Sequence, residues 1–185
     1  MTPRKEVQLA EELIEKYGIS EPPVPIEVIA AGEGAAIARN HFNGPQSGFA
    51  LRSESGEKVI GVNTATSPRR QRFTIAHELG HLLLQHEGDL ILDYEVRAHF
   101  RSEKPLHINH RDASSSLATN AEEIQANRFA AEILMPKHMV FAEARAALAA
   151  KEMGRESLIR KLAAAFNVSP EAMGYRLVNL TILVP

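Results

Sequence analysis

The amino-acid sequence predicts an α+β protein that is mainly helical and carries a small three-stranded antiparallel sheet in its first half. Two observations support this fold class. Three short strand-like runs lie close together between residues 35 and 63, and apolar residues recur at helical spacing before and after them. We predict a core over residues 1–150 and a helix-turn-helix-like region over residues 151–185, which packs on that core as part of one structural unit.

The composition narrows the class of protein and the kind of site. With 185 residues, of which 44% are hydrophobic and 24% charged, the chain is an ordinary globular protein. It contains no cysteine, so any metal site must use His, Asp or Glu. A net charge of −2 gives no overall electrostatic attraction to nucleic acid. Because no secretory signal or membrane-spanning stretch is recognisable, we expect a cytoplasmic protein without a membrane partner.

Hydrophobic spacing and chain-breaking residues define the first elements. Apolar residues such as Leu9 and Leu13 share one face of a helix that ends at Gly18. A proline-rich connector follows, and residues 26–31 are predicted to form a second, short helix. The three strands are predicted over residues 35–39, 48–52 and 58–63.

The rest of the chain is predicted to be helical. Ser67 is expected to be the N-cap of a helix that has Pro68 in its first turn and runs to about His86. Another long helix runs from about Asn120 to Met135, before Pro136. Shorter helices are predicted over residues 137–150, 155–166 and 170–179.

The helix after Ser67 contains the pattern H-E-x-x-H, formed by His77, Glu78 and His81. Residues four apart lie on one face of an α-helix, so both imidazoles can bind one metal ion. Glu78 is turned about 100° from His77, so it can take a proton from a water at that ion instead of binding the ion. Chance predicts this pattern about 0.04 times in such a chain, and two structural core histidines are the weaker alternative.

A catalytic zinc takes three protein ligands, and we predict Glu123 as the third. It lies on the small and apolar face of the helix near residues 120–135, and Asn127, four residues on, can hydrogen-bond a ligand histidine. The neighbouring Glu122 has a different predicted role, because Thr119-x-x-Glu122 fits a capping box at the start of the helix.

Other histidines remain alternatives for the third ligand. His107 and His110 lie in a possible strand over residues 106–110, where alternation lets at most one of them face inward. His138 and Tyr175 are candidates for polarising a substrate carbonyl in the transition state, although their spacing does not require it.

Three segments resemble the ImmA/IrrE family of metallo-endopeptidases. The first is R-F-T-I-A-H-E-L-G-H-L-L-L at residues 72–84. The second, and the most specific, is E-I-Q-A-N-R-F-A-A-E-I-L-M-P at residues 123–136. The third is L-A-A-A-F-N-V-S-P-E-A-M-G-Y-R-L-V-N-L at residues 162–180. The order of the predicted elements also fits, so the resemblance covers nearly the whole chain.

The resemblance implies a zincin-like, specifically gluzincin-like, protease core with one Zn²⁺ per chain. It makes His77 and His81 zinc ligands, Glu123 the third ligand and Glu78 the catalytic base. Members are typically bacterial or phage-related, and several cleave a helix-turn-helix repressor. The resemblance therefore implies such a repressor as the protein substrate, and its cleavage would derepress stress or mobile-element genes.

Peptide hydrolysis is the main functional prediction, and two alternatives use the same fold without turnover. A DNA-binding regulator is one, but the possible recognition helix carries a single basic residue, Arg176, so direct DNA binding is the weaker alternative and stays open. A toxin–antitoxin component is the other, and the intact Glu78 argues against it. The cluster of Arg69, Arg70 and Arg72 is expected to be solvated or to meet an acidic substrate segment.

Overall fold

The computed structural model describes residues 4–43, 46–53, 55–85, 115–150 and 154–184. Within them the predicted α+β class is confirmed, because helices dominate and one small sheet is present. The elements are α1 (Lys5–Lys16), α2 (Ile26–Gly32), β1 (Ala35–Asn40), β2 (Gly48–Arg52), β3 (Lys58–Asn63), α3 (Pro68–Leu84), α4 (Ser115–Leu134), α5 (Lys137–Ala150), α6 (Arg155–Phe166) and α7 (Pro170–Asn179).

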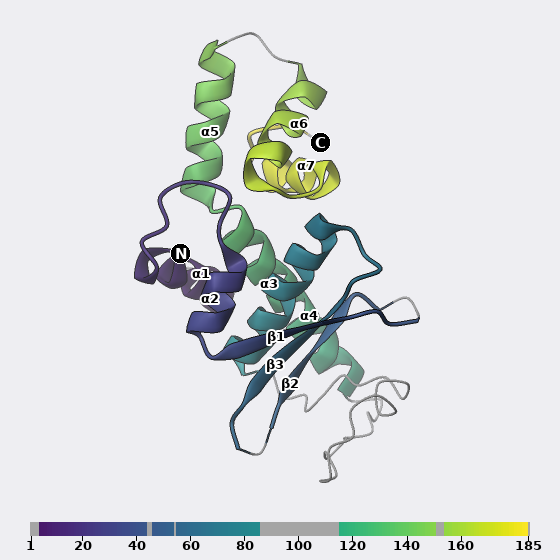
Figure 1. Cartoon of the computed structure of the whole chain (residues 1–185). Coiled ribbons are helices and arrows are strands. Elements are labelled where there is room, and N and C mark those ends of the chain that lie inside the picture. Colours follow the sequence, from purple (N-terminus) through teal and green to yellow (C-terminus); the bar gives the residue numbers. More distant parts are fainter. Residues whose placement is uncertain (1–3, 44–45, 54, 86–114, 151–153, 185) are drawn as a thin grey trace.

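The sheet, α3 and α4 form successive layers (Figure 1). Helix α3 packs against β2 and β3 on one side and against α4 on the other, and α1 packs on α4. Helix α2 contacts both β1 and α3. Helices α5, α6 and α7 lie at the top of Figure 1, away from the sheet. This arrangement places α3 in the centre of the molecule, between the sheet and α4.

The sheet is mixed, with the strand order β1-β3-β2. The hairpin pair β2 and β3 is antiparallel, as predicted, but β1 pairs with β3 in parallel, with Ala35 opposite Lys58. The prediction of a wholly antiparallel sheet is therefore wrong. Strand β3 is the most deeply buried of the three, with Ile60 and Val62 inaccessible, and it takes the central position. Two chain reversals bring β3 into the same direction as β1, so their pairing is parallel.

The ends of α3 and α1 follow the expected local chemistry. The Ser67 hydroxyl accepts a hydrogen bond of 3.3 Å from the backbone N–H of Arg70, as expected of an N-cap. Helix α3 ends one turn after the H-E-x-x-H pattern, where Gln85 adopts a left-handed conformation with φ of 55°. Gly18 follows α1 with φ of 62°, a conformation that glycine adopts without strain.

Helix α4 begins at Ser115, earlier than the predicted start near Asn120. Thr119 therefore lies inside the helix, where it cannot cap the N-terminus, and the predicted capping box with Glu122 is wrong. Serine and threonine are weak helix formers that favour caps, so a helix that starts within a polar run is easily placed too late. The possible strand over residues 106–110 lies outside the described residues.

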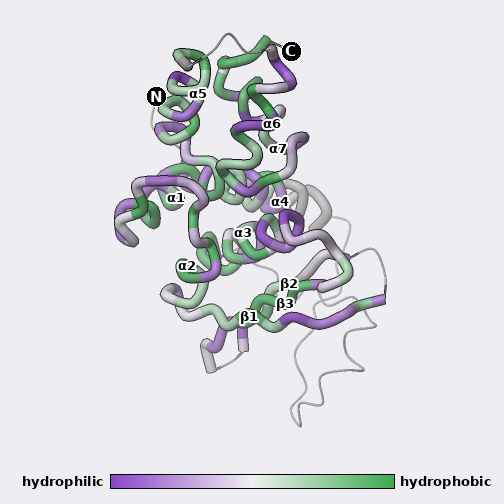
Figure 2. Tube along the Cα trace, turned by 45° about the horizontal axis from the view of Figure 1, so that its top comes forward, coloured by the Kyte–Doolittle hydropathy of each residue, from purple (hydrophilic) through white to green (hydrophobic). Residues whose placement is uncertain are grey.

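A continuous cluster of buried apolar side chains extends from the sheet to the C-terminal helices. Its members include Ile60 of β3, Leu79 of α3, Phe129 of α4 and Leu177 of α7. Figure 2 shows the corresponding green, hydrophobic stretches along α3, β3 and α5. The cluster crosses residue 150, and the predicted division of the chain at that point stays a prediction. None of the described helices combines the length and the apolar character that crossing a bilayer requires.

A buried ion pair joins the C-terminal helices to α4. Arg176 of α7 donates from Nη2 to Glu132 Oε2 at 2.5 Å and from Nε to the carbonyl of Met135 at 3.0 Å. The second carboxylate oxygen of Glu132 accepts the backbone N–H of Lys137, the first residue of α5, at 3.0 Å. The Glu132 carboxylate thus contacts both the start of α5 and α7. Glu132 and Arg176 are both buried.

Replacing Arg176 by Met is expected to lower the free energy of unfolding by about 3–5 kcal/mol, because it leaves the buried Glu132 carboxylate without its partner. Urea denaturation followed by circular dichroism measures this change. The matched control is Arg160→Met, which removes an exposed i,i+4 pair with Glu156 and should cost no more than about 0.5 kcal/mol. Equal urea midpoints for Arg176→Met and the unaltered protein would contradict the role of the buried pair.

Candidate metal centre

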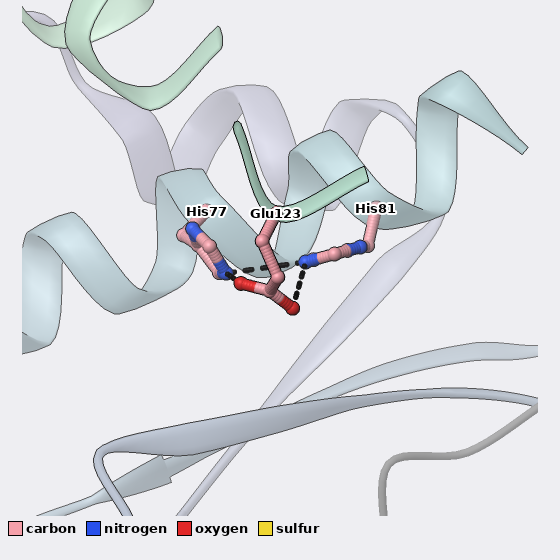
Figure 3. A group of neighbouring side chains, drawn as sticks. All are labelled: His77, His81 and Glu123. Carbon is pink, nitrogen blue, oxygen red and sulfur yellow. Dashed lines mark hydrogen bonds and ion pairs between the residues drawn. The ribbon is translucent and has the colours of Figure 1, made fainter. Parts of the chain in front are cut away.

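Two histidines of α3 and one glutamate of α4 bring their side chains together (Figure 3). The Nε2 atoms of His77 and His81 are 3.1 Å apart. Glu123 Oε2 lies 3.2 Å from His77 Nε2, and its Oε1 lies 3.3 Å from His81 Nε2. In Figure 3 the carboxylate reaches both imidazoles. The structure therefore assembles the three residues predicted as metal ligands.

The spacing of these three groups suits a divalent metal ion. Around a tetrahedral zinc ion with bonds of about 2.0–2.1 Å to nitrogen and oxygen, neighbouring ligand atoms lie roughly 3.3–3.4 Å apart. The measured separations of 3.1, 3.2 and 3.3 Å are close to this value. Two imidazoles and one carboxylate also form a donor set that catalytic zinc sites use, with a fourth position for water. The cluster can therefore hold a divalent ion.

Close packing of α3 on α4 sets the distance between the ligands. A Cβ atom at Gly80 would lie 2.9 Å from Phe129 Cδ1 and 3.4 Å from Ala126 Cα of α4. A glycine inside a helix costs about 1 kcal/mol relative to alanine, so its presence here needs a reason. The reason is steric, because even a Cβ at position 80 would require Phe129 of α4 to shift.

Asn127 fixes the orientation of one ligand. Its Oδ1 lies 3.1 Å from His77 Nδ1. An amide oxygen can only accept a hydrogen bond, so His77 must carry its proton on Nδ1 when this bond forms. That tautomer leaves the Nε2 lone pair directed at the cluster, as a metal ligand requires. The structure thus places Asn127 where the sequence predicts it.

Glu78 lies beside the cluster without joining it. It is only 9% exposed, and it lines a cavity of about 370 Å³ together with His77 and Glu123. Burial raises the pKa of the Glu78 carboxyl above its ordinary 4.5, and the charge of Glu123 raises it further, against the opposing effect of His77 and His81. A carboxylate of raised pKa next to a metal site can act as a proton acceptor.

The electrostatics of the cluster link His77 to Glu123. Burial would lower the pKa of the His77 imidazole, but the hydrogen bond and charge of Glu123, with Glu78 and Asn127, outweigh burial and raise the pKa above 6.5. Conversely, hydrogen bonds from His77 and His81 hold the pKa of Glu123 far below 4.5. Glu123 is therefore ionised at neutral pH, ready to bind a cation.

The remaining predicted residues lie elsewhere or outside the described residues. His138 lines a different cavity, between α1 and the start of α5, so its place does not support a role at the cluster. Tyr175 lines a groove that adjoins the cluster cavity, and it is 67% exposed. His107 and His110 fall outside the described residues.

The sequence analysis did not place several further residues in the cluster cavity. Gly48 is the first residue of β2 and Ser47 precedes it, whereas Arg70 and Phe73 come from the first turns of α3. Arg70 and Phe73 could have been found, because they precede His77 by seven and four residues and so share its helical face. Ser47 and Gly48 carry no comparable signal, since only the tertiary fold brings β2 over α3.

The chain is similar to proteins of one known family. The family model described as the IrrE N-terminal-like domain, peptidase M78, matches residues 33–178. The radiation response metalloprotease IrrE of Deinococcus radiodurans is 54% identical over 35 residues, which are 19% of this chain and 11% of that protein. A solved structure described as a Mycobacterium tuberculosis transcriptional regulator has the same fold, with a TM-score of 0.59 and 20% identity. The match covers 94% of this chain and 46% of that structure, so the chain spans less than half of each relative.

Replacing Glu123 by Ala is expected to weaken Zn²⁺ binding by more than about 100-fold, because loss of a residue that merely orients a ligand already costs 10–100-fold. Equilibrium dialysis followed by elemental analysis measures the change. The matched control is Glu122→Ala, which removes the same charge from the adjacent position and should bind Zn²⁺ as the unaltered chain does. If Glu123→Ala kept full affinity, Glu123 would not be a ligand.

Acidification is expected to weaken Zn²⁺ binding. The metal requires a neutral His77 imidazole, whose raised pKa keeps it protonated to a higher pH than a free imidazole. Below that pKa each displaced proton lowers the apparent affinity about tenfold per pH unit. Glu123 stays ionised and adds nothing to the slope, because its pKa is depressed. Competition with a chelator between about pH 8 and pH 6 tests this, and a constant affinity would refute it.

Proposed function

This chain belongs to the peptidase M78 family, described as the IrrE N-terminal-like domain, and from that membership we propose that it is a zinc-dependent endopeptidase with one Zn²⁺ per chain. The observation that carries the proposal is the position of Glu78. This buried carboxylate lines the same cavity as His77 and Glu123 but is not one of the three converging ligands. A site that only stored a metal ion would not need it.

The three residues of the cluster and Glu78 have different roles in the proposed reaction. His77, His81 and Glu123 would hold the zinc ion, which would supply the Lewis-acid chemistry that lowers the pKa of a water and polarises a peptide carbonyl. Glu78 takes the proton from the attacking water and then gives it to the nitrogen of the departing amine. The raised pKa of Glu78 suits it to hold that proton between the two transfers.

An extended peptide can reach the cavity along strand β2. Strand β2 is at an edge of the sheet, and its first residue, Gly48, lines the cavity next to Glu78. Among the described strands β2 pairs only with β3, which leaves its other edge able to hydrogen-bond a substrate main chain. Such pairing would hold a peptide bond in a fixed orientation beside the general base.

The proposed substrate is a helix-turn-helix transcriptional repressor, whose cleavage would derepress stress or mobile-element genes. Support comes from the three segments that resemble the ImmA/IrrE family, in which several members cleave such repressors. A repressor acts on DNA in the cytoplasm, so the protein would act there without a membrane partner. Incubating the chain with a repressor encoded beside its own gene, followed by mass spectrometry of the products, tests this substrate.

The structure disfavours direct reading of DNA by the helix pair α6 and α7. Arg176 is the basic residue of α7, and it is buried against Glu132 and the Met135 carbonyl. Met173 and Leu177 of the same helix are also buried. A recognition helix needs accessible basic side chains for phosphates and bases, and α7 uses these positions for packing.

Replacing Glu78 by Gln is expected to leave Zn²⁺ binding intact and to slow peptide hydrolysis about 100- to 10 000-fold, the usual contribution of a general base. The measurement is the rate at which Zn²⁺-loaded protein cleaves quenched fluorescent peptides, with the metal content determined in parallel. Glu122→Gln, which alters the half-buried neighbour of Glu123, is the control and should retain activity. A Glu78→Gln protein as fast as the unaltered one would remove the proposed mechanism.

A further inference from the structure

A groove of about 960 Å³ adjoins the metal cavity on the side of the C-terminal helices. Its walls come from the first turns of α3, from the face of α4 beyond Asn127, and from α7 with the turn before it. Apolar and charged residues both line it, among them Arg69, Arg70, Ala131, Met135, Ala172 and Tyr175. The groove is large enough for several residues of an extended peptide.

The groove and the metal cavity are continuous. Arg70, Phe73 and Asn127 line both of them. Asn127 contacts the metal ligand His77, and Arg70 lies about two helical turns before His77 on α3. A peptide bound in the metal cavity would therefore pass Arg70 as it entered the groove.

Arg70 is held at this boundary by an aromatic side chain. Its guanidinium carbon lies 5.7 Å from the centre of the Phe73 ring, and that ring stacks on His77 with 6.2 Å between centres. Arg70 Nη2 also donates to the Ser47 hydroxyl at 3.3 Å. Among the described residues no carboxylate pairs with Arg70, which is exposed. Its charge is thus available to a substrate.

The charged side chains that line the groove are unevenly distributed. Arg176 is neutralised by Glu132. Glu171 lies on the α7 side, where it would repel an acidic segment, and Arg69 lies beside Arg70 in the first turn of α3. Positive charge is therefore concentrated at the α3 end, next to the metal cavity.

We propose that this groove is the specificity site of the peptidase, and that it binds the substrate segment flanking the scissile bond with an acidic side chain on Arg70. The proposal rests on the proposed function. Arg70 precedes His77 by seven residues, about 10.5 Å along the helix, and an extended chain advances about 3.3 Å per residue. The acidic side chain therefore lies about three residues from the cleaved bond, and apolar neighbours contact Ala131 and Met135.

The test is cleavage of a synthetic randomised peptide library by the Zn²⁺-loaded chain, with the cleaved sites sequenced by mass spectrometry. Asp and Glu are expected to be about twofold to fivefold enriched about three residues from the cleaved bond, the range for an exposed charge pair. Arg70→Gln should abolish the enrichment, and Arg70→Glu should replace it with enrichment of Lys and Arg. All variants should bind Zn²⁺ equally.

The matched control is Arg145→Gln, which removes an exposed positive charge from α5, outside the groove. This variant should keep the acidic preference of the unaltered chain. If the library is cleaved without an acidic preference near the bond, or if Arg70→Gln keeps that preference, the groove assignment is overturned while the peptidase function stands.

A binding experiment separates the groove from catalysis. Immobilised, Zn²⁺-loaded Glu78→Gln protein is used to select peptides from the same library, with and without the additional Arg70→Glu change. Acidic peptides selected only when Arg70 is present support the groove even if the unaltered chain cleaves nothing, in which case the proposed function alone fails. The absence of any Arg70-dependent selection and of cleavage overturns both.

Discussion

The direct packing of α3 on α4 is the contact on which the metal cluster depends. The two histidines lie one turn apart on α3, so local helix geometry alone aligns them. Glu123 belongs to another helix, and it reaches them because Gly80 lets Phe129 and Ala126 approach α3 without an intervening side chain. The fully buried Phe129 and Leu79 keep the helices in this position. The cost of a glycine within a buried helix is thus offset by the geometry of the site.

Two glutamates near the same histidines have pKa values that shift in opposite directions. Glu123 receives hydrogen bonds from both imidazoles, which lower its pKa and keep it charged. Glu78 lies deeper, where burial dominates and raises its pKa. The pKa values of two identical side chains therefore shift in opposite directions, because Glu123 accepts hydrogen bonds from the imidazoles and Glu78 is more deeply buried. This separation suits one to hold a cation permanently and the other to exchange a proton.

Features that depend on neighbours in sequence were predicted better than features that depend on contacts between distant segments. The spacing of His77 and His81, the cap at Ser67 and most helix bounds follow from neighbours in sequence, and the structure agrees with them. The parallel pairing of β1 with β3 was missed because strand order depends on which strand is buried most, which the sequence does not state directly. The boundary residue Arg70 was seen only as part of a basic run. Its significance arises from the groove that α7 completes.

Helix α4 connects the candidate metal site to the C-terminal helices. Its successive turns carry Glu123 at the cluster, Asn127 on His77, and Glu132, which binds Arg176 of α7. Removing α7 would leave the Glu132 carboxylate buried without its partner, which is costly, and would remove one wall of the groove. Although α6 and α7 resemble a helix-turn-helix pair, the inward-facing residues of α7 are committed to this contact. The geometry of α7 therefore favours a role as one wall of the proposed substrate groove over a role in reading DNA.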